Sequence, residues 1–278
     1  MKIGLFGINM RPCVTARAVA EAARTAEEAG FESFWGGEHI VQADPQTAES
    51  PMPPRTEFVD LTVAIAFAAA HTRRLRFGTG IIILPLRNPV VLAKQLASVD
   101  VVSGGRFICG FGIGNLEFEF AAVGVPFDHK GRRAEEAIGV MRALWCGGAF
   151  HGRYFNVSGV RAEPRPVQQP RIPIIFGGKS EFAFSRTARL GDGWYGYGLD
   201  LEAARTCIEG IRVACEWHGR RFEEVEVSIT PKAAVADRDL VRRYEDLGVG
   251  RVIIAPRART IEEMIEGIEQ NGRKLIGN

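Results

Sequence analysis

The 278-residue sequence lacks an excess of charge of either sign. It contains 35 Lys and Arg residues and 33 Asp and Glu residues, so its formal net charge is only +2. Domains that bind nucleic acid usually carry a clustered basic surface, so we expect no nucleic-acid partner. The sequence also contains no run of about 18 consecutive apolar residues, which a membrane-spanning helix needs, so we expect no membrane partner.

Cysteine pairs with metal-binding spacing are missing as well. The five cysteines are scattered along the chain, and none belongs to a CxxC motif: Cys13, Cys109, Cys146, Cys207 and Cys215. Scattered cysteines in odd number are typical of free thiols in a reducing compartment, and no cluster has the ligand spacing of a zinc site. The first residues, MKIGLFGINMRPC, are too quickly interrupted for a signal peptide. We therefore expect a cytoplasmic protein without a bound metal.

The length limits how many domains the chain can form. A (β/α)8 barrel takes about 250 residues, so one barrel would leave 278 − 250, or about 28 residues. That remainder is smaller than the roughly 50 residues of a small domain. Two domains of about 140 residues would fit equally well on length alone, so the pattern along the chain has to decide.

Short apolar runs alternate with amphipathic segments along the whole chain. The expected strands are 2–6, 32–35, 76–84, 106–111, 172–176, 193–197, 225–230 and 251–255. The expected helices are 17–29, 58–71, 89–102, 117–122 with 131–146, 181–190, 201–218, 237–247 and 260–270. Such alternation predicts a parallel sheet, and eight units favour an α/β fold of the closed (β/α)8 TIM-barrel type, forming a single domain over residues 1–278. An open sheet that binds a dinucleotide would need GxGxxG after its first strand, where only Gly7 occurs.

Two connections and two helix starts have signals of their own. Residues 42–55 contain several prolines and should form a loop, and residues 147–162 should form a small hairpin. Together they account for most of the residues beyond a minimal barrel, and they are candidates to cover the pocket. Thr260 and Glu263 have the spacing of a capping box, and Glu57 and Asp60 suit the first turn of the second helix.

The active site of such a barrel lies at the C-terminal ends of its strands. The second strand is followed by Glu38 and His39, and a histidine can transfer a proton near neutral pH. A histidine that is merely hydrogen-bonded in a loop is the alternative. The other strand ends are rich in glycine, which lets a ligand approach the backbone: Gly80 and Ile81, then Gly112, Gly114 and Asn115, then Gly177, Gly178, Lys179 and Ser180, and finally Gly196 and Tyr197.

The best candidate for an anion site is the segment 177–180, which directly precedes a predicted helix. Backbone N–H groups at a helix start bind phosphate, and Lys179 adds positive charge. The alternative is a tight turn with Ser180 as the helix cap. Paired carboxylates, Glu38 with Glu57 or Glu117 with Glu119, leave a glycosidase open as a remote alternative, because sequence does not give the distance between them. No GxSxG motif supports a serine hydrolase.

Taken together, these segments resemble the luciferase-like flavin and deazaflavin oxidoreductases, whose fold is a (β/α)8 barrel. The similarity covers nearly the whole chain and depends on the order and spacing of five segments: AEEAGFESFWGGEH, HTRRLRFGTGIIILPLRNPVVLAKQLASVD, SGGRFICGFGIGNLEFEFAAVGVPF, PIIFGGKS and ARLGDGW. Within the family, the resemblance is strongest to members that use the deazaflavin coenzyme F420. Monooxygenases that use FMN share most of the same segments.

The resemblance implies roles for particular residues. A histidine and its acidic neighbour in deazaflavin relatives correspond to His39 and Glu38. A cis peptide bond that supports the ring in those relatives corresponds to Gly80–Ile81. The phosphate-binding backbone corresponds to Gly177, Gly178 and Ser180. Family members are often homodimers, which is the assembly that the resemblance predicts here.

Two departures bear on the substrate. Sugar-phosphate dehydrogenases of the family have a glutamate where this chain has Asn115, and a lysine whose nearest match here is Asp200. Both differences argue against a sugar-phosphate substrate, and they leave His39 as the only obvious proton-transfer group. The hypothesis is therefore hydride transfer between F420 and an unidentified small organic molecule. An FMN-dependent monooxygenase that uses O2 is the first alternative, and a barrel that binds a flavin or deazaflavin without catalysis is the second.

Overall fold

Parallel strands and helices alternate along the chain in the computed structural model, which describes residues 1–50, 52–232 and 237–277. The strands of the main sheet are β1 (Lys2–Phe6), β2 (Ser33–Gly36), β3 (Arg76–Thr79), β4 (Ile82–Ile83), β5 (Phe107–Gly112), β8 (Ile174–Gly177), β9 (Gly193–Leu199), β10 (Glu226–Pro231) and β11 (Arg251–Ile254). The α-helices are α1 (Ala16–Glu28), α2 (Leu61–Ala70), α3 (Pro89–Ser103), α4 (Glu117–Ala122), α5 (Lys130–Cys146), α6 (Glu181–Leu190), α7 (Leu201–Trp217), α8 (Arg238–Asp246) and α9 (Ile261–Asn271). Short 3-10 turns occupy Leu84–Leu86 and Phe222–Glu224, and a π-helical turn spans Gly272–Ile276.

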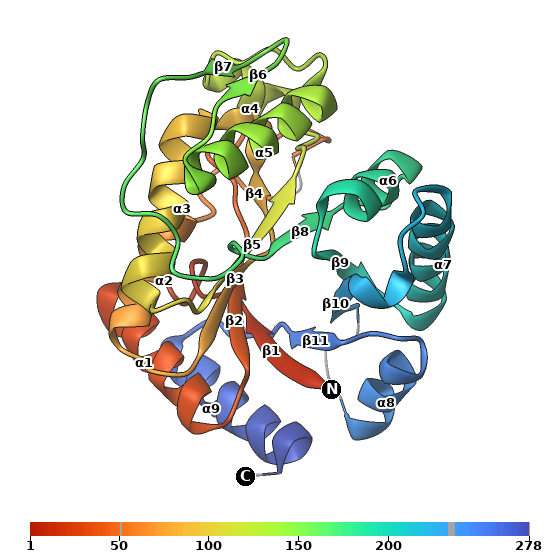
Figure 1. Cartoon of the computed structure of the whole chain (residues 1–278). Coiled ribbons are helices and arrows are strands. Elements are labelled where there is room, and N and C mark those ends of the chain that lie inside the picture. Colours follow the sequence, from red (N-terminus) through yellow and green to blue (C-terminus); the bar gives the residue numbers. More distant parts are fainter. Residues whose placement is uncertain (51, 233–236, 278) are drawn as a thin grey trace.

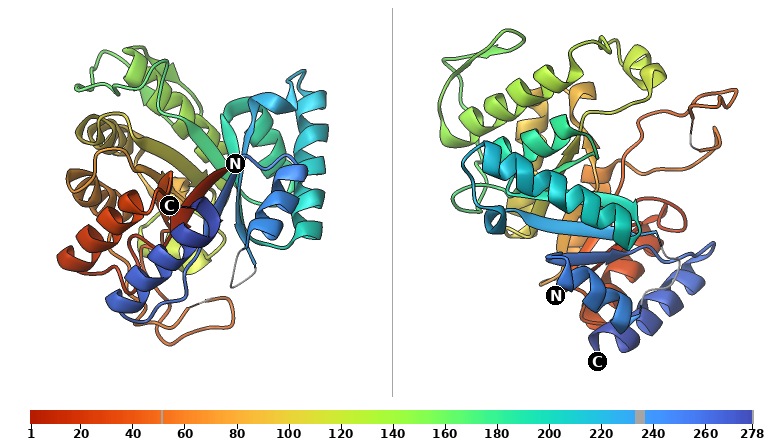
Figure 2. Two further views of the ribbon diagram at one scale, coloured as in Figure 1. Left: turned by 90° about the horizontal axis from the view of Figure 1, so that it is seen from below. Right: turned by 90° about the vertical axis from the view of Figure 1, so that its right-hand side faces the viewer.

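The strands close into a barrel. Their order is β3-β2-β1-β11-β10-β9-β8-β5-β4, and β3 also pairs with β5, so the ends of the sheet meet. All pairings within this sheet are parallel, and the helices lie outside the strands (Figures 1 and 2). This confirms the predicted single-domain (β/α)8 barrel. It also places the ends of β1, β2, β3, β5, β8 and β9 around one opening.

The third barrel strand is interrupted, so the prediction of one continuous strand over 76–84 is wrong. β3 ends at Thr79 and pairs with β2 and β5, and the chain resumes as β4, which pairs with β5 alone. The Gly80–Ile81 peptide bond between them is cis, as the resemblance predicted. Gly80 N donates to Gly36 O at 2.7 Å, which holds the interruption against the end of β2. A side chain at Gly80 would meet Tyr195, since an added Cβ would lie 2.8 Å from its Cε1.

The barrel interior is filled by large side chains that point inward. One cluster contains Phe6, Trp35, Ile108, Ile175, Tyr195 and Ile253, and the Trp35 and Tyr195 rings stack with centroids 5.7 Å apart. These residues alternate along their strands with residues that face the helices. The filled interior means that a ligand can reach the barrel only at its open end, where the strands stop.

Local hydrogen-bonding signals set where the helices begin. Side-chain oxygens of the N-cap residues accept first-turn N–H groups in seven helices: Thr15, Asp60, Asn88, Ser180, Asp200, Asp237 and Thr260. The Asp60 cap starts α2 three residues later than predicted, so Glu57 lies before the helix and pairs with Arg11 instead. The capping box is only half formed: Thr260 accepts from Glu263 N, but Glu263 accepts from Arg259 N and not from Thr260 N.

The two predicted irregular connections differ in their relation to the barrel opening. Residues 42–50 and 52–55 form no helix or strand, as expected, and Pro51 lies outside the described residues; Figure 2 shows this connection, in orange, extending from the barrel. Residues 147–162 contain the predicted hairpin, with β6 (Phe150–His151) antiparallel to β7 (Asn156–Val157). Glu136 of α5 accepts N–H groups from residues 153–155, which ties the hairpin to the outside of α5 (Figure 1).

Candidate active site

A cavity of about 510 Å³ lies at the open end of the barrel. Its walls come from the ends of six barrel strands and from the segments that follow them. The residues that line it are Phe6, Met10, Gly37, Glu38, His39, Met52, Phe58, Gly80, Ile81, Ile83, Gly112, Ile113, Gly114, Asn115, Gly177, Gly178, Ser180, Ala183, Arg186 and Tyr197. Apolar side chains predominate, with few polar groups among them, which is the composition of a site for an organic ligand. We call this space the barrel-mouth cavity.

His39 is held at the edge of this cavity by a carboxylate from a different part of the chain. Its Nδ1 lies 3.3 Å from Glu119 Oε2, and the backbone N–H of Ile40 donates to Glu119 Oε1 at 3.0 Å. The Glu119 side chain is 1% exposed and that of His39 is 19% exposed. With Nδ1 engaged by the carboxylate, Nε2 is the ring nitrogen available to a ligand. The acidic partner that the sequence did not reveal is therefore Glu119.

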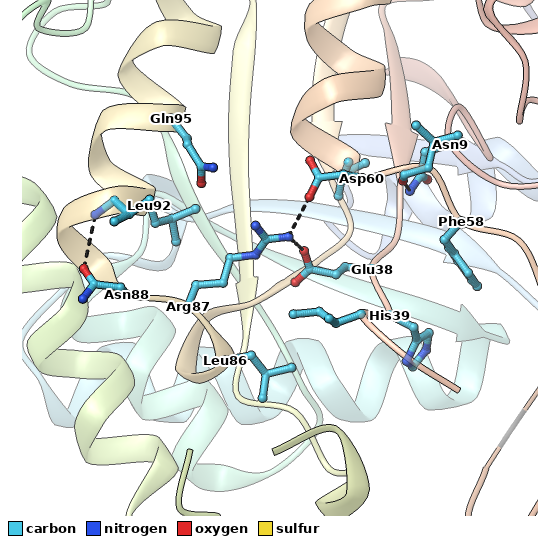
Figure 3. Close-up of a pocket in the computed structure, with 14 residues that line it drawn as sticks. Asn9, Glu38, His39, Phe58, Asp60, Leu86, Arg87, Asn88, Leu92 and Gln95 are labelled. Atoms are coloured by element: carbon cyan, nitrogen blue, oxygen red, sulfur yellow. Dashed lines mark hydrogen bonds and ion pairs between the residues drawn. The ribbon is translucent and has the colours of Figure 1, made fainter. Parts of the chain in front are cut away.

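Glu38, the sequence neighbour of His39, belongs to a separate ion cluster. Its Oε2 accepts from Ile83 N at 2.7 Å, and its Oε1 accepts from Arg87, whose guanidinium also donates to Asp60 at 3.0 Å. Burial raises the pKa of Glu38, and the Arg87 charge offsets this effect only in part. Figure 3 shows Arg87 between the two carboxylates, with the His39 ring on the far side of Glu38. Glu38 thus anchors the segment that carries His39.

The Glu38 cluster lines a second space, which we call the α2–α3 pocket. It has a volume of about 500 Å³ and lies at the starts of α2 and α3 (Figure 3). Glu38, His39 and Phe58 line both this pocket and the barrel-mouth cavity, so they form the partition between the two. Phe58 stands edge-on to the His39 ring, with the ring centroids 5.7 Å apart.

The wall of the barrel-mouth cavity is shaped by missing side chains. A Cβ at Gly112 would lie 2.5 Å from Ile81 Cδ1, and one at Gly177 would lie 3.2 Å from Ile81 Cγ2. A Cβ at Gly37 would lie 3.6 Å from the Gly80 carbonyl oxygen. The absence of side chains at Gly112 and Gly177 leaves room for the Ile81 side chain against these strand ends, and Ile81 forms an apolar part of the cavity wall on which a flat ring can pack. The residues present therefore fit a tricyclic flavin or deazaflavin ring.

The adjoining part of the cavity wall, where β8 leads into α6, is suited to a phosphate. Gly177 and Gly178 lead into α6, and Gly178 has a φ of +112°, a conformation that side-chain-bearing residues rarely adopt. Ser180 caps the helix by accepting from Ala183 N at 3.3 Å, which leaves other first-turn N–H groups available to an anion. Arg186 of the same helix also lines the cavity and is 4% exposed.

The structure brings together most of the residues expected at the site. His39, Glu38, Gly80, Ile81, Gly112, Gly114, Asn115, Gly177, Gly178, Ser180 and Tyr197 all line the cavity. Lys179 does not line the cavity, because its side chain is exposed to solvent. Gly196 does not either, because residues alternate along β9: a Cβ there would lie 2.5 Å from Trp194 and Leu199 atoms. The hairpin at 147–162 contributes no described residue to the lining, whereas Met52 of the 42–55 connection does.

The sequence did not predict the place of three residues at the site: Glu119, which bonds to His39, and Arg186 and Phe58, which line the cavity. Glu119 had one usable signal, since it stands between Phe118 and Phe120 in a short helix, a position that implies burial. Arg186 had none, because an arginine in an amphipathic helix normally faces solvent. Phe58 was assigned to a helix that in fact begins at Leu61.

Two kinds of site are missing from residues 1–50, 52–232 and 237–277. No group of three or more His, Cys, Asp and Glu side chains there could hold a metal ion. Within the same ranges, no helix is both long enough and apolar enough to cross a membrane.

Residues 5–272 match the model of the family described as luciferase-like monooxygenase. An uncharacterised protein of Mycobacterium tuberculosis is 31% identical over 274 residues, which cover 91% of this chain and 93% of that protein. An F420-dependent glucose-6-phosphate dehydrogenase of Kineococcus radiotolerans is 29% identical over 237 residues, 82% of this chain and 66% of that protein. An FMNH(2)-dependent dimethylsulfone monooxygenase of Pseudomonas putida is 30% identical over 184 residues, 64% of this chain and 49% of that protein.

Solved structures share the fold at lower identity. Monooxygenase RslO1 from Streptomyces bottropensis superposes with a TM-score of 0.78 at 23% identity, covering 99% of both chains. An F420-dependent secondary alcohol dehydrogenase in complex with an F420-acetone adduct superposes with a TM-score of 0.80 at 16% identity, covering 99% of this chain and 98% of that one. The relatives and neighbours thus include both F420-dependent and FMN-dependent proteins.

Proposed function

Because the chain belongs to the luciferase-like monooxygenase family, we propose that it is an oxidoreductase that transfers a hydride between coenzyme F420 and a small organic substrate. The observation that carries this proposal is the contact between His39 Nδ1 and the buried Glu119 carboxylate at the edge of the barrel-mouth cavity. A histidine oriented in this way suits the proton transfer that accompanies oxidation of an alcohol or reduction of a carbonyl.

When bound, the deazaflavin supplies two-electron hydride chemistry, and the protein supplies position and surroundings. The apolar wall formed by Ile81 would support the ring, and the start of α6 would hold the phosphate. Apolar side chains of Phe6, Met10 and Phe58 would keep water away from the reacting atoms. These residues would thus bind and orient the cofactor and exclude water from the site, without taking part in the making or breaking of bonds.

His39 would exchange a proton with the substrate oxygen through Nε2. Glu119 accepts from Nδ1 when that nitrogen carries the proton, so it fixes the tautomer that leaves Nε2 as an acceptor. In this state Nε2 would accept the hydroxyl proton when an alcohol substrate is oxidised. In the reverse direction the protonated ring returns that proton to the carbonyl oxygen. Glu119 would stabilise the protonated ring by its negative charge.

Anaerobic titration of the purified protein with F420 and with FMN tests the cofactor. We expect saturable binding of F420, measured by the change in its fluorescence, and weaker binding of FMN. Tight binding of FMN without binding of F420 would overturn the proposal and favour the O2-using monooxygenase. Bound F420 should then turn over with a panel of small alcohols, aldehydes and ketones, whereas binding without turnover on any of them would favour a non-catalytic barrel.

We also propose that the chain forms a homodimer, as the family resemblance suggests. The outward side of α2 supports this, because Val63 and Phe67 are 60% and 38% exposed and the neighbouring Ala66 and Ala70 carry no charge. An uncharged face of this kind can pack on its own copy without repulsion between like charges. Light scattering coupled to size-exclusion chromatography would measure the mass, and a monomer at all concentrations would refute this assembly.

A further inference from the structure

The first turn of α5 has the features of an anion site. Its N-cap residue, His129, provides no side-chain hydrogen bond to the first-turn N–H groups, and this turn contains no acidic residue. Lys130, Arg132 and Arg133 place positive charge at the same end of the helix. Cations at a helix start oppose the helix dipole, and uncapped N–H groups require acceptors. Both conditions are satisfied when an anion binds there.

A buried arginine beside this turn gives an independent indication of a ligand. Arg186 lines the barrel-mouth cavity and is 4% exposed, and its Nε has no hydrogen-bond partner among the described residues. The nearest acid is Glu135, at 3.4 Å from that Nε, and the same carboxylate lies 2.8 Å from Arg189 Nη2. One carboxylate therefore faces two guanidinium groups, which leaves one positive charge uncompensated. Buried polar atoms without partners are uncommon and often mark a ligand site.

The two features adjoin each other. A Cβ on Gly131, the second residue of α5, would lie 3.0 Å from Arg186 Nη2, so the guanidinium contacts the first turn of α5. α5 and α6 follow β5 and β8, which are neighbours in the barrel (Figure 1). A ligand group beside Arg186 is therefore close both to the start of α5 and to the cavity.

The other charged groups near this turn are engaged or exposed. Lys130 Nζ lies 3.3 Å from the centroid of the Phe127 ring. Burial lowers the pKa of Lys130, and the negative charge of Glu117 offsets this effect in part. Arg133 donates to the Pro126 carbonyl oxygen. Asp128 precedes the turn and is exposed. These contacts leave Arg186 and the first-turn N–H groups as the available partners for an anion.

We propose that Arg186 and the first turn of α5 bind an anionic group of the cofactor that lies beyond the phosphate held at the start of α6. This inference rests on the proposed function. F420 carries carboxylates beyond its phosphate, whereas FMN ends at its phosphate. The site would therefore favour the deazaflavin over the flavin, and it would do so through charge and not through the shape of the ring.

Binding constants of three probes test the site in the Arg186→Gln variant. The probes are F420, FMN and the deazaflavin riboside, which lacks both the phosphate and the carboxylates. We expect the affinity for F420 to fall about tenfold, because a charge-assisted contact is lost. The affinities for FMN and for the riboside should change by less than about twofold. Arg186→Lys should retain most of the F420 affinity, and Arg205→Gln, an exposed charge change on α7, should leave all three affinities unchanged.

Each result distinguishes the inference from the proposed function. Equal losses of affinity for F420 and FMN would mean that Arg186 binds the phosphate that both cofactors carry. This result would overturn the inference but not the proposed function. Unchanged F420 affinity in Arg186→Gln would overturn it as well, while the proposed function would stand. Failure of the wild-type protein to bind F420 would overturn both. If the Gln variant does not fold, the wild-type protein still provides the test: its F420 affinity should fall more steeply with salt than its FMN affinity, and equal slopes would refute the site.

Discussion

Two buried arginines at opposite ends of the barrel differ in how fully they are bonded. At the N-terminal end, Arg251 is 1% exposed, donates twice to Glu32 at 2.9 and 3.0 Å, and donates to Ser228 at 3.0 Å. At the C-terminal end, Arg186 is 4% exposed, and its Nε makes no hydrogen bond within the described chain. The fold itself provides hydrogen-bond acceptors for the Arg251 guanidinium. The Nε donor of Arg186 lacks such an acceptor and is available to a ligand.

This difference extends to the surroundings of each arginine. The Arg251 guanidinium lies 5.4 Å from the Trp35 ring, below the side chains that fill the barrel. Arg186 lies where glycines replace side chains and a cavity opens. In barrels of this type, the N-terminal end stabilises the fold and the C-terminal end carries the chemistry. Substitutions at the two ends should therefore affect different measurements.

The largest expected effect is on catalysis at the C-terminal end. His39→Ala should lower kcat by about a hundredfold or more, since it removes the proposed proton-transfer group. The free energy of unfolding should change by less than about 1 kcal/mol, because Glu119 keeps its hydrogen bond from Ile40 N. Steady-state kinetics and urea denaturation measure the two quantities. His151→Ala, on the exposed hairpin, is the matched control, and unchanged turnover in His39→Ala would remove this residue from the mechanism.

Glu119→Gln separates positioning from catalysis within the same pair. Glutamine can still accept from Ile40 N, but it can donate to His39 Nδ1 and so favours the wrong tautomer. We expect kcat to fall about tenfold and its pH profile to move, because the charge beside the imidazole is gone. A fall in kcat with an unchanged pH profile would mean that Glu119 is only structural.

The largest expected effect on stability is at the N-terminal end. Arg251→Leu leaves Glu32 without its bidentate partner and should lower the free energy of unfolding by about 3 kcal/mol. Cofactor affinity should stay within about twofold, since Arg251 lies at the far end of the barrel. Urea denaturation followed by cofactor titration checks both. A variant that keeps its stability but binds the cofactor more weakly would contradict the assignment of stability to the N-terminal end.

A backbone change should combine both kinds of effect. Gly178 has a φ of +112°, and an added Cβ would lie 2.9 Å from Ala183 Cβ at the start of α6. Gly178→Ala should therefore lower the free energy of unfolding by about 1–2 kcal/mol and also weaken cofactor binding about tenfold. Gly219→Ala is the control, because its φ is also positive, at +65°, but no atom lies within 4 Å of the added Cβ. Equal binding by both variants would show that the turn does not hold the phosphate.

The smallest effect concerns the ion cluster beside His39 and depends on pH. Desolvation alone would raise the pKa of Asp60, but hydrogen bonds from Thr62, Arg87 and Val63 lower it overall. The folded carboxyl thus binds its proton less tightly than the unfolded one. Its contribution to stability is present above the unfolded value of about 3.9 and is lost as pH falls through the lowered folded value.

Asp60→Asn tests this pH dependence, because asparagine can keep the helix cap while losing the charge. The wild-type protein should be more stable by up to about 1 kcal/mol at neutral pH. The difference should vanish in acid, as urea denaturation at a series of pH values would show. A difference that stays constant down to pH 2 would exclude the ionic origin.

Some of the site could be predicted from sequence because its signals are local. The glycines at the strand ends and the helix start after Gly178 each follow from a few neighbouring residues. Lys179 was expected at the cofactor site but does not line the cavity, because a local pattern does not say which way a side chain points. The pairing of His39 with Glu119 joins residues 80 positions apart. The contact between Arg186 and Gly131 likewise joins two helices that follow different strands.

The sequence by itself determined the alternation of strands and helices, the closed parallel barrel and the end at which a site would form. These follow from hydrophobic periodicity and from glycine and capping residues, which act over a few positions. Only the tertiary structure decided which carboxylate serves His39, that Glu38 instead binds Arg87, and that Arg186 is buried beside the cavity. The physical reason is that barrel closure sets distances between residues far apart in the chain, and no local pattern encodes those distances.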